Sequence, residues 1–91
     1  MVQEDWDDLR FVLAVSEEGT VSAAARRLGV NHATVLRRIA RFEDRCGQIF
    51  DKTPRGYVLA QGQAGLLAAA REVERAVLGV GRVLAGARMP L

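Results

Sequence analysis

The residues best suited to chemistry lie in one stretch of this 91-residue chain, residues 28–42, LGVNHATVLRRIARF. His32, the only histidine, follows Asn31, and the pair Arg37 and Arg38 comes five residues later. Amide, imidazole and guanidinium groups donate hydrogen bonds, so the chemistry favoured here is binding of a negatively charged partner. The alternative is an ordinary amphipathic helix with a polar cap and solvated charges.

No constellation in the sequence favours catalysis or metal binding. One histidine and one cysteine cannot form a zinc site, and there is no paired-carboxylate cleft, Cys–His arrangement or phosphate-cradling glycine motif. The sequence therefore predicts no enzyme, cofactor or metal ion. The acidic residues of the first helix are interpreted as ordinary surface charge. Cys46, which cannot form a disulfide within the chain, is interpreted as a small buried apolar residue in a reducing compartment.

Charge is unevenly distributed, although the formal net charge is only +2. Residues 1–18 carry six acidic residues and one arginine, for a net charge of −5. Residues 19–56 carry eight basic and three acidic residues, for +5, and residues 57–91 carry four basic and two acidic residues, for +2. This sorting predicts that the middle segment contacts a polyanion. A surface that is merely solvated would not need it.

The length suits one small domain whose stability is marginal without added support. No apolar run is long enough for a transmembrane helix, so no membrane association is expected. The N-terminal residues MVQEDWDD are acidic and lack an apolar centre, unlike a signal peptide. We expect a cytoplasmic protein.

Caps and glycines predict two helices on either side of residue 19. The first is expected from Asp5, a favourable N-cap, to Glu18, which is followed by a glycine. A second, short helix is expected over residues 20–28, capped by Thr20 or Ser22 and broken by the next glycine.

A third helix is expected to begin at Asn31, another favoured N-cap, and to end before Gly47. The connection LGVN contains a glycine and joins the second and third helices in the layout of a helix-turn-helix. An apolar stripe of the third helix should face the core. Its members are Val35, Ile39, Phe42 and Cys46.

The opposite side of the third helix should carry the binding residues. At about 100° per residue, Arg37 lies roughly 200° from Val35. Ala33 and Ala40 share that outward side and leave room for close approach. In a helix-turn-helix this helix enters the DNA major groove, where an arginine can bind both acceptors of a guanine. The N–H groups of the first turn, near His32, favour a phosphate.

Five further residues of this helix lie near the outward side, and three of them have more than one interpretation. Leu36 and Arg41 lie at the edges of the outward side. Arg38 and Arg45 either solvate the flank of the helix or touch the DNA backbone. His32 either contacts a base or is a solvated residue of the first turn.

Residues 48–60, QIFDKTPRGYVLA, predict a β-hairpin. Two short β-prone pieces flank DKTPRG, in which Pro54 suits the second position of a tight turn and Gly56 its end. Lys52 and Arg55 make the tip of this hairpin basic.

Residues 61–87 predict a long helix, with Pro90 beyond its end. About 25 helical residues span close to 40 Å, more than a domain of about 60 residues can cover. Each glycine in this helix weakens it by about 1 kcal/mol relative to alanine, so packing from outside is needed. A heptad-type stripe, whose first part packs on its own domain, predicts a dimer with a second copy. The stripe consists of Leu66, Ala70, Val73, Val77, Val80, Leu84 and Ala87.

Over roughly residues 9–67 the chain resembles the N-terminal winged helix-turn-helix domain of LysR-type transcriptional regulators. The resemblance rests on AAARRLGV, on RRI…FE in the third helix, on G…IF after it, and on TPRG before a leucine and a long helix. It implies a mainly α fold of three helices, a short β-hairpin wing and a C-terminal dimerisation helix. It also implies a bacterial regulator that binds an interrupted palindrome in double-stranded DNA as a homodimer, or as a tetramer in the full-length protein.

The resemblance assigns base reading to the first turns of the third helix. Arg37 matches the family's reading arginine, and His32 and Ala33 occupy reading positions with other side chains. Leu36 replaces a hydroxyl residue with an apolar one that could contact thymine. The wing would touch backbone or minor groove. The candidate DNA-binding residues are Asn31, His32, Ala33, Thr34, Leu36, Arg37, Arg38, Arg41, Lys52, Thr53, Pro54 and Arg55.

The start of the long helix departs from the family pattern. Ala60 stands where the family has a capping threonine, and Gly62 precedes Gln63, where the family has glycine. The helix start is therefore expected to differ by about one residue.

The expected organisation is a winged helix-turn-helix over residues 1–60, a dimerisation helix over 61–87 and a tail over 88–91. The tail would lead toward an inducer-binding domain of the family, so no small-molecule ligand is expected in this chain. The chain is either a piece of a longer regulator, the interpretation favoured here, or a natural stand-alone domain. The alternative function is a protein-interaction module, but the outward Arg37 and the basic hairpin tip favour DNA binding.

Overall fold

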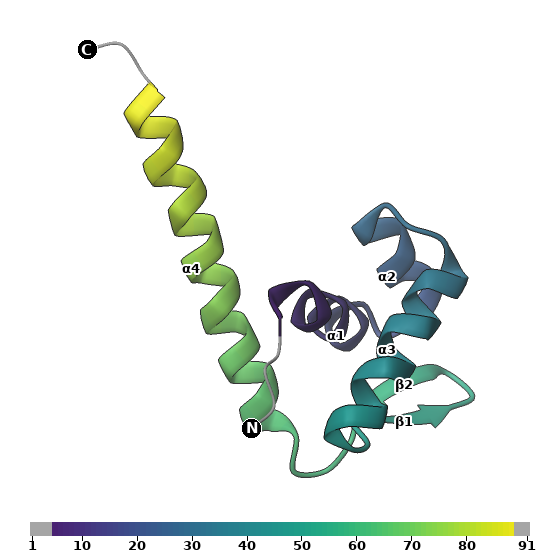
Figure 1. Ribbon diagram of the computed structural model, residues 1–91. Coiled ribbons are helices and arrows are strands. Elements are labelled where there is room, and N and C mark those ends of the chain that lie inside the picture. The colour runs from purple at the N-terminus through teal and green to yellow at the C-terminus, as the bar shows by residue number, and fades with distance from the viewer. Residues whose placement is uncertain (1–4, 89–91) are drawn as a thin grey trace.

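The structure, a computed structural model, describes residues 5–88 and the side chains of residues 5–86. It confirms the predicted winged helix-turn-helix with a long C-terminal helix (Figure 1). The predicted tail, with Pro90, falls almost entirely outside the described residues. The elements are α1 (Trp6–Glu18), α2 (Val21–Leu28), α3 (His32–Cys46), β1 (Phe50–Thr53), β2 (Gly56–Leu59) and α4 (Ala64–Arg88).

Local sequence explains where the first three helices begin and end. The side chains of Asp5, Thr20 and Asn31 accept hydrogen bonds from backbone N–H groups two or three residues further on. These bonds satisfy donors that a helix start leaves unpaired. The glycines after α1 and α2 have φ values of 83° and 70°, a left-handed conformation that glycine adopts without strain. The predicted caps are confirmed, with Thr20 rather than Ser22 capping α2.

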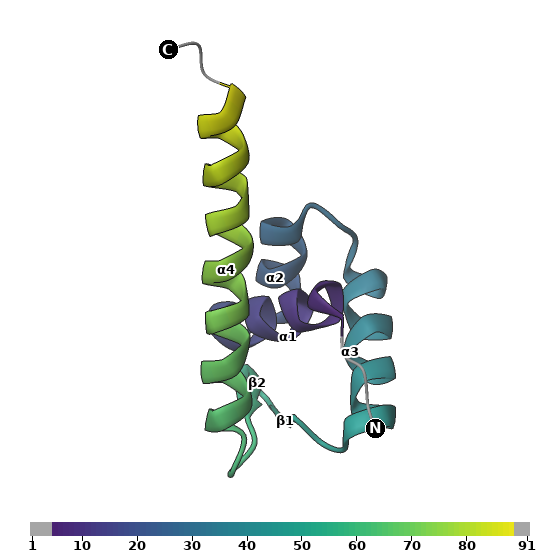
Figure 2. The ribbon, with the colours of Figure 1, turned by 60° about the vertical axis from the view of Figure 1, so that its left-hand side comes forward.

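The helix α1 lies at the centre of the domain. It crosses between α3 and α4, with α2 packed beside it (Figure 2). Residues 11–15 are all buried, because α1 has neighbours on several sides. Burial of each large apolar side chain contributes roughly 1.5–3 kcal/mol, so this core is the main source of stability. It consists of Phe11, Val12, Ala14, Val15, Val21, Ala24, Ala25, Val35, Ile39, Phe42, Ile49 and Phe50.

The hairpin is an antiparallel ladder whose register sets Phe50 opposite Leu59. Its tight turn lies where TPRG predicted it. The first strand begins at Phe50 rather than at residue 48. The reason is that the backbone N–H groups of Ile49 and Phe50 donate to Oε2 of Glu43, at 2.8 and 3.0 Å, and tie this segment to α3.

The wing is fastened to the connection between α1 and α2. The N–H of Tyr57 donates to the carbonyl oxygen of Gly19 at 2.8 Å. Gly56 has a φ of 132°, and a Cβ at this position would overlap the same carbonyl oxygen. Only glycine allows this close approach of the two backbones.

The long helix α4 begins at Ala64, three residues later than predicted. Gly62 has a φ of 88°, which no helix contains, so residues 61–63 leave the hairpin in a turn. Gln63 Nε2 donates to the carbonyl oxygen of Gln48 at 3.0 Å and holds the turn in place.

Only the first part of α4 packs on the rest of the domain. Leu66 contacts the core and Ala70 is 1% exposed. Beyond these residues α4 runs past α1 and α2, and the molecule measures 53 × 31 × 18 Å (Figures 1 and 2). The far part of α4 exposes large apolar side chains, namely Val77, Leu78, Val80, Val83 and Leu84.

One predicted core residue is wrong. Cys46 is exposed at the last position of α3, whereas the other three members of its stripe are buried. After Gly47 the chain turns back and brings Ile49 and Phe50 into the core. These two side chains, rather than that of Cys46, are the buried apolar residues that follow Phe42 in the chain.

Candidate nucleic-acid interface

The helix-turn-helix holds the first turn of α3 in one geometry. After Gly29, the N–H of Val30 donates to the carbonyl oxygen of Ala25 at 3.1 Å. Asn31 Oδ1 accepts from both the N–H and the hydroxyl of Thr34, at 2.8 and 2.9 Å. Asn31 and Thr34 therefore bind each other and cap the start of α3.

The side of α3 opposite the core is open, as predicted. Ala33, Arg37 and Ala40 are exposed, and Leu36 at its edge is 38% exposed. Val35, on the other side, is completely buried. Within residues 5–88, no hydrogen bond or ion pair engages the guanidinium of Arg37. A charged fork between two small side chains is thus free to approach a flat or grooved surface.

His32 occupies the first position of α3 and is exposed. Its Nδ1 lies 3.4 Å from the hydroxyl oxygen of Ser22 on α2. A neutral imidazole that accepts at Nδ1 carries its proton on Nε2, which can then donate to an acceptor.

The tip of the hairpin is exposed and basic. Lys52, Thr53, Pro54 and Arg55 are all exposed. The hydroxyl of Thr53 donates to the carbonyl oxygen of Gly56 at 3.0 Å and accepts from the N–H of Arg55 at 3.2 Å. These bonds stiffen a tip that points away from α4 (Figure 1).

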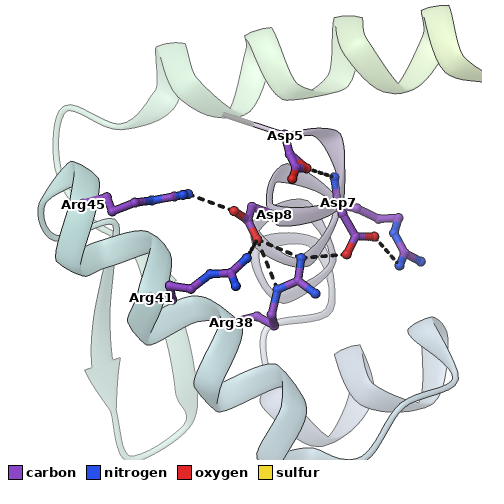
Figure 3. Close-up of polar contacts among 7 residues, drawn as sticks. Asp5, Asp7, Asp8, Arg38, Arg41 and Arg45 are labelled. Atoms are coloured by element: carbon purple, nitrogen blue, oxygen red, sulfur yellow. Dashed lines mark hydrogen bonds and ion pairs between the residues drawn. The ribbon is translucent and has the colours of Figure 1, made fainter. Parts of the chain in front are cut away.

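A buried carboxylate supports α3 from the side of α1. Asp8 is 1% exposed; its Oδ1 accepts from Nη2 of Arg38 and of Arg41, at 2.8 Å each, and its Oδ2 accepts from Arg45 at 2.8 Å. Arg38 Nη2 also donates to Asp7 at 2.6 Å. Figure 3 shows the three arginines converging on Asp8. The Asp8 cluster is defined as Asp7, Asp8, Arg38, Arg41 and Arg45.

The Asp8 cluster corrects two interpretations of the sequence. Asp8 is not ordinary surface charge, and Arg38 does not simply solvate the flank of α3. The side chain of Arg38 is 18% exposed and its guanidinium lies 4.6 Å from the ring centroid of Phe11. One signal could have revealed this: spacings of three and four place all three arginines on one side of α3, complementary to the acidic N-terminal segment. Part of the charge sorting therefore serves internal pairing.

These contacts shift the pKa values of the acidic residues. Burial raises the pKa of Asp8, but hydrogen bonds from Arg38, Arg41 and Arg45 lower it by more, and the result lies below the usual value. Hydrogen bonds from Arg10 and Arg38 lower the pKa of Asp7.

Acid is therefore expected to destabilise the domain. Because the folded-state pKa values of Asp7 and Asp8 are depressed, their stabilisation is complete above the unfolded-state pKa, about 4, and is lost as the pH falls through the folded-state values. The urea midpoint, followed by circular dichroism, should be level down to about pH 5 and fall below about pH 4. Asp8→Asn is the control and should show a shallower fall. A parent midpoint that stays level to about pH 3 would contradict the assignment.

A second set of ion pairs joins α4 to α1 and α2. Glu17 lies 2.8 Å from Arg27 and 3.1 Å from Arg71. Arg27 also lies 3.3 Å from Glu18 and 3.8 Å from Glu74. Pairs this exposed contribute at most about 1 kcal/mol each, but together they favour one direction for α4 as it leaves the domain.

Across residues 5–88, no group of His, Cys, Asp and Glu side chains is placed to hold a metal ion. No helix in the same range has the length and apolar character to cross a membrane.

The chain is similar in sequence to known bacterial regulatory proteins. Residues 6–66 match the sequence model of the bacterial regulatory helix-turn-helix proteins of the lysR family. The HTH-type transcriptional regulator ClcR of Pseudomonas putida is 36% identical over 70 residues. That alignment covers 76% of this chain and 24% of ClcR, so the chain spans about a quarter of the length of this relative.

Solved structures share the fold. The crystal structure of a DNA complex of the CbnR DNA-binding domain is 30% identical, with a TM-score of 0.76 over 93% of this chain and 100% of that one. A DNA complex of the BenM DNA-binding domain has a TM-score of 0.81 over 96% of this chain and 100% of that one, at 21% identity. At that identity the likeness to BenM supports the fold alone.

Proposed function

We propose that this chain, which belongs to the LysR family of bacterial regulatory helix-turn-helix proteins as its sequence predicted, reads double-stranded DNA with α3 in the major groove. The observation that carries the proposal is the outward side of α3, where Arg37 stands exposed between Ala33 and Ala40. The CbnR domain, which has the same fold, was crystallised with DNA, and this supports the proposal. Because chromosomal DNA is the proposed ligand, the bacterial cytoplasm is the proposed location.

Different residues of α3 have different proposed roles. Arg37 binds the two major-groove acceptors of a guanine, and His32 donates from Nε2 to a base or phosphate. Leu36, an exposed apolar residue at the edge of the reading side, contacts a thymine methyl group. Asn31 and Thr34, which bind each other, orient the N–H groups of the first turn toward a phosphate.

The arginines of the Asp8 cluster divide into two proposed roles. Arg41 is 55% exposed, so its guanidinium can touch a phosphate while one nitrogen stays on Asp8. Arg38 is mostly covered and bonded to both Asp7 and Asp8. We therefore assign Arg38 to the support of α3 and not to the DNA surface.

The wing is proposed to bind the DNA backbone without reading sequence. Replacing Arg55 by alanine should weaken binding to all duplexes alike, because the rigid, exposed tip offers one phosphate contact. The slope of log affinity against log salt should become shallower by about one unit, measured by fluorescence anisotropy on mixed-sequence duplex.

A matched control separates this contact from general charge. Arg75→Ala removes the same charge from an exposed position on α4, outside the wing. It should leave the salt slope unchanged. Equal slopes for the two variants would show that Arg55 does not contact phosphate.

We also propose that the far part of α4 pairs with a second copy of the chain to give a homodimer. A tetramer is proposed only for a full-length regulator. Val77, Val80 and Leu84 are 40%, 59% and 52% exposed and continue one stripe. Leu66 and Ala70, in the first part of the predicted stripe, face their own domain: Leu66 packs against the core and Ala70 is 1% exposed. The last predicted member of the stripe, residue 87, lies outside the described side chains.

One experiment tests the proposed function as a whole. The purified chain is used to select duplexes from a randomised pool, and the enriched sequence is then footprinted. We expect two half-sites related by a two-fold axis, because two α3 helices would be held at a fixed distance by the dimer. Recovery of an unbiased pool, or no retention of DNA, would favour the alternative of a protein-interaction module.

A further inference from the structure

The Asp8 cluster lies beside the proposed reading side of α3 without belonging to it. At about 100° per residue, Arg41 is roughly 40° around the helix from Arg37, Arg45 about 80° and Arg38 about 100°. All three guanidinium groups are bonded to one carboxylate that comes from α1 and is 1% exposed. A strip of positive charge next to the reading residues is thus anchored from inside the protein.

Anchoring changes what these arginines can do on DNA. An unrestrained arginine follows whichever phosphate is near, and such contacts supply most sequence-independent affinity. An arginine fixed by a buried partner meets a phosphate only where the backbone passes its fixed position. The carboxylate also cancels one of the positive charges that would otherwise attract any duplex. The fixed position of the arginines and the cancelled charge both lower the affinity for random DNA relative to the affinity for a specific site.

We propose that Asp8 is a specificity-determining residue that acts through the arginines of α3 and contacts no DNA itself. By holding Arg38 and Arg41 against α1, Asp8 suppresses phosphate contacts in wrong registers and leaves discrimination to the reading side. This role rests on the proposed function, since it requires that α3 reads DNA. It differs from a purely structural role, which would change specific and non-specific binding in proportion to the folded fraction.

The test compares the parent chain with Asp8→Asn on two probes, the duplex enriched by the parent and a mixed-sequence duplex. Asparagine retains one acceptor oxygen, and circular dichroism in urea first establishes that the variant is folded under the binding conditions. We expect severalfold tighter binding to the mixed-sequence duplex and a salt slope steeper by about one unit. The ratio of specific to non-specific affinity should fall severalfold, and a second selection with the variant should give a less defined sequence.

Asp44→Asn is the matched control, because it makes the same change in charge at an exposed position of α3 outside the Asp8 cluster. It should alter both affinities slightly and equally. Equal effects of the two variants would reduce the role of Asp8 to net charge and overturn the proposal. A folded Asp8→Asn protein with an unchanged ratio and salt slope would overturn it as well.

A second variant covers the case in which Asp8→Asn does not fold. Arg41→Lys keeps the positive charge and the bonds of Asp8 to Arg38 and Arg45, but exchanges a planar fork for a flexible ammonium group. The affinity ratio should again fall, and an unchanged ratio would contradict the proposal. If the parent chain enriches no sequence, the proposed function itself is wrong. If the parent enriches a sequence and the variants discriminate equally well, only the proposed role of Asp8 is wrong.

Discussion

Replacing Val80 by aspartate is expected to give a monomer that has lost most of its affinity for a two-half-site operator. Val80 is 59% exposed in the single chain and lies in the middle of the proposed dimer stripe. A carboxylate there would lose its hydration in the paired state without a partner, which costs several kcal/mol. Without the dimer, the two winged helix-turn-helix domains bind their half-sites independently, so operator affinity should fall by about a hundredfold or more. Sedimentation analysis gives the mass, and mobility shifts give the affinity.

Two comparisons make this result specific. Leu78 is similarly exposed, at 57%, but lies about 160° around α4 from Val80, so Leu78→Asp should leave the dimer intact. A duplex with one half-site should bind the parent and Val80→Asp equally. A monomeric parent at micromolar concentrations, or a Val80→Asp protein that remains dimeric, would show that α4 is not the dimer interface.

Replacing Arg37 by alanine is expected to cost about 1–3 kcal/mol of specific affinity, a loss of roughly 5- to 150-fold. The reason is that Arg37 faces away from the core, is exposed and has no partner within the described residues, so its fork is available to a base. Affinity for mixed-sequence duplex should fall much less. Selection with the variant should show relaxed preference at one base pair in each half-site.

Arg37→Lys distinguishes a base contact from a phosphate contact. Lysine keeps the charge but cannot donate two parallel hydrogen bonds to one guanine in the geometry of arginine. If Arg37 reads a base, Arg37→Lys should resemble Arg37→Ala on the enriched duplex and the parent on mixed-sequence duplex. Equal loss of specific and non-specific affinity in Arg37→Ala would make Arg37 a phosphate contact only.

Local sequence patterns are sufficient to predict the order and type of the elements and the outward side of α3. An N-cap depends on a side chain that reaches a backbone N–H two or three residues away, so the caps Asp5, Thr20 and Asn31 can be predicted locally. The helix ends are equally local, because they depend on glycine at positive φ. Helical periodicity is equally local, and it placed Val35 in the core and Arg37 opposite it. Most of the fold and the proposed reading surface follow from these short-range rules.

Contacts between residues of different elements depend on how the helices and the hairpin pack together. Periodicity predicts the side of a helix on which a residue lies. It does not predict which element packs against that side, or over how many residues of the helix that packing extends. Asp8 looked like surface charge because α3 is thirty residues away in sequence, yet the packing of α1 against α3 buries it among three arginines. Cys46 continues the apolar stripe of α3 in sequence, yet it is exposed at the last position of the helix. Ile49, which follows the turn after α3, is buried in the core instead. The docking of helices is set by the summed packing of the whole core, and a single sequence segment does not contain that information.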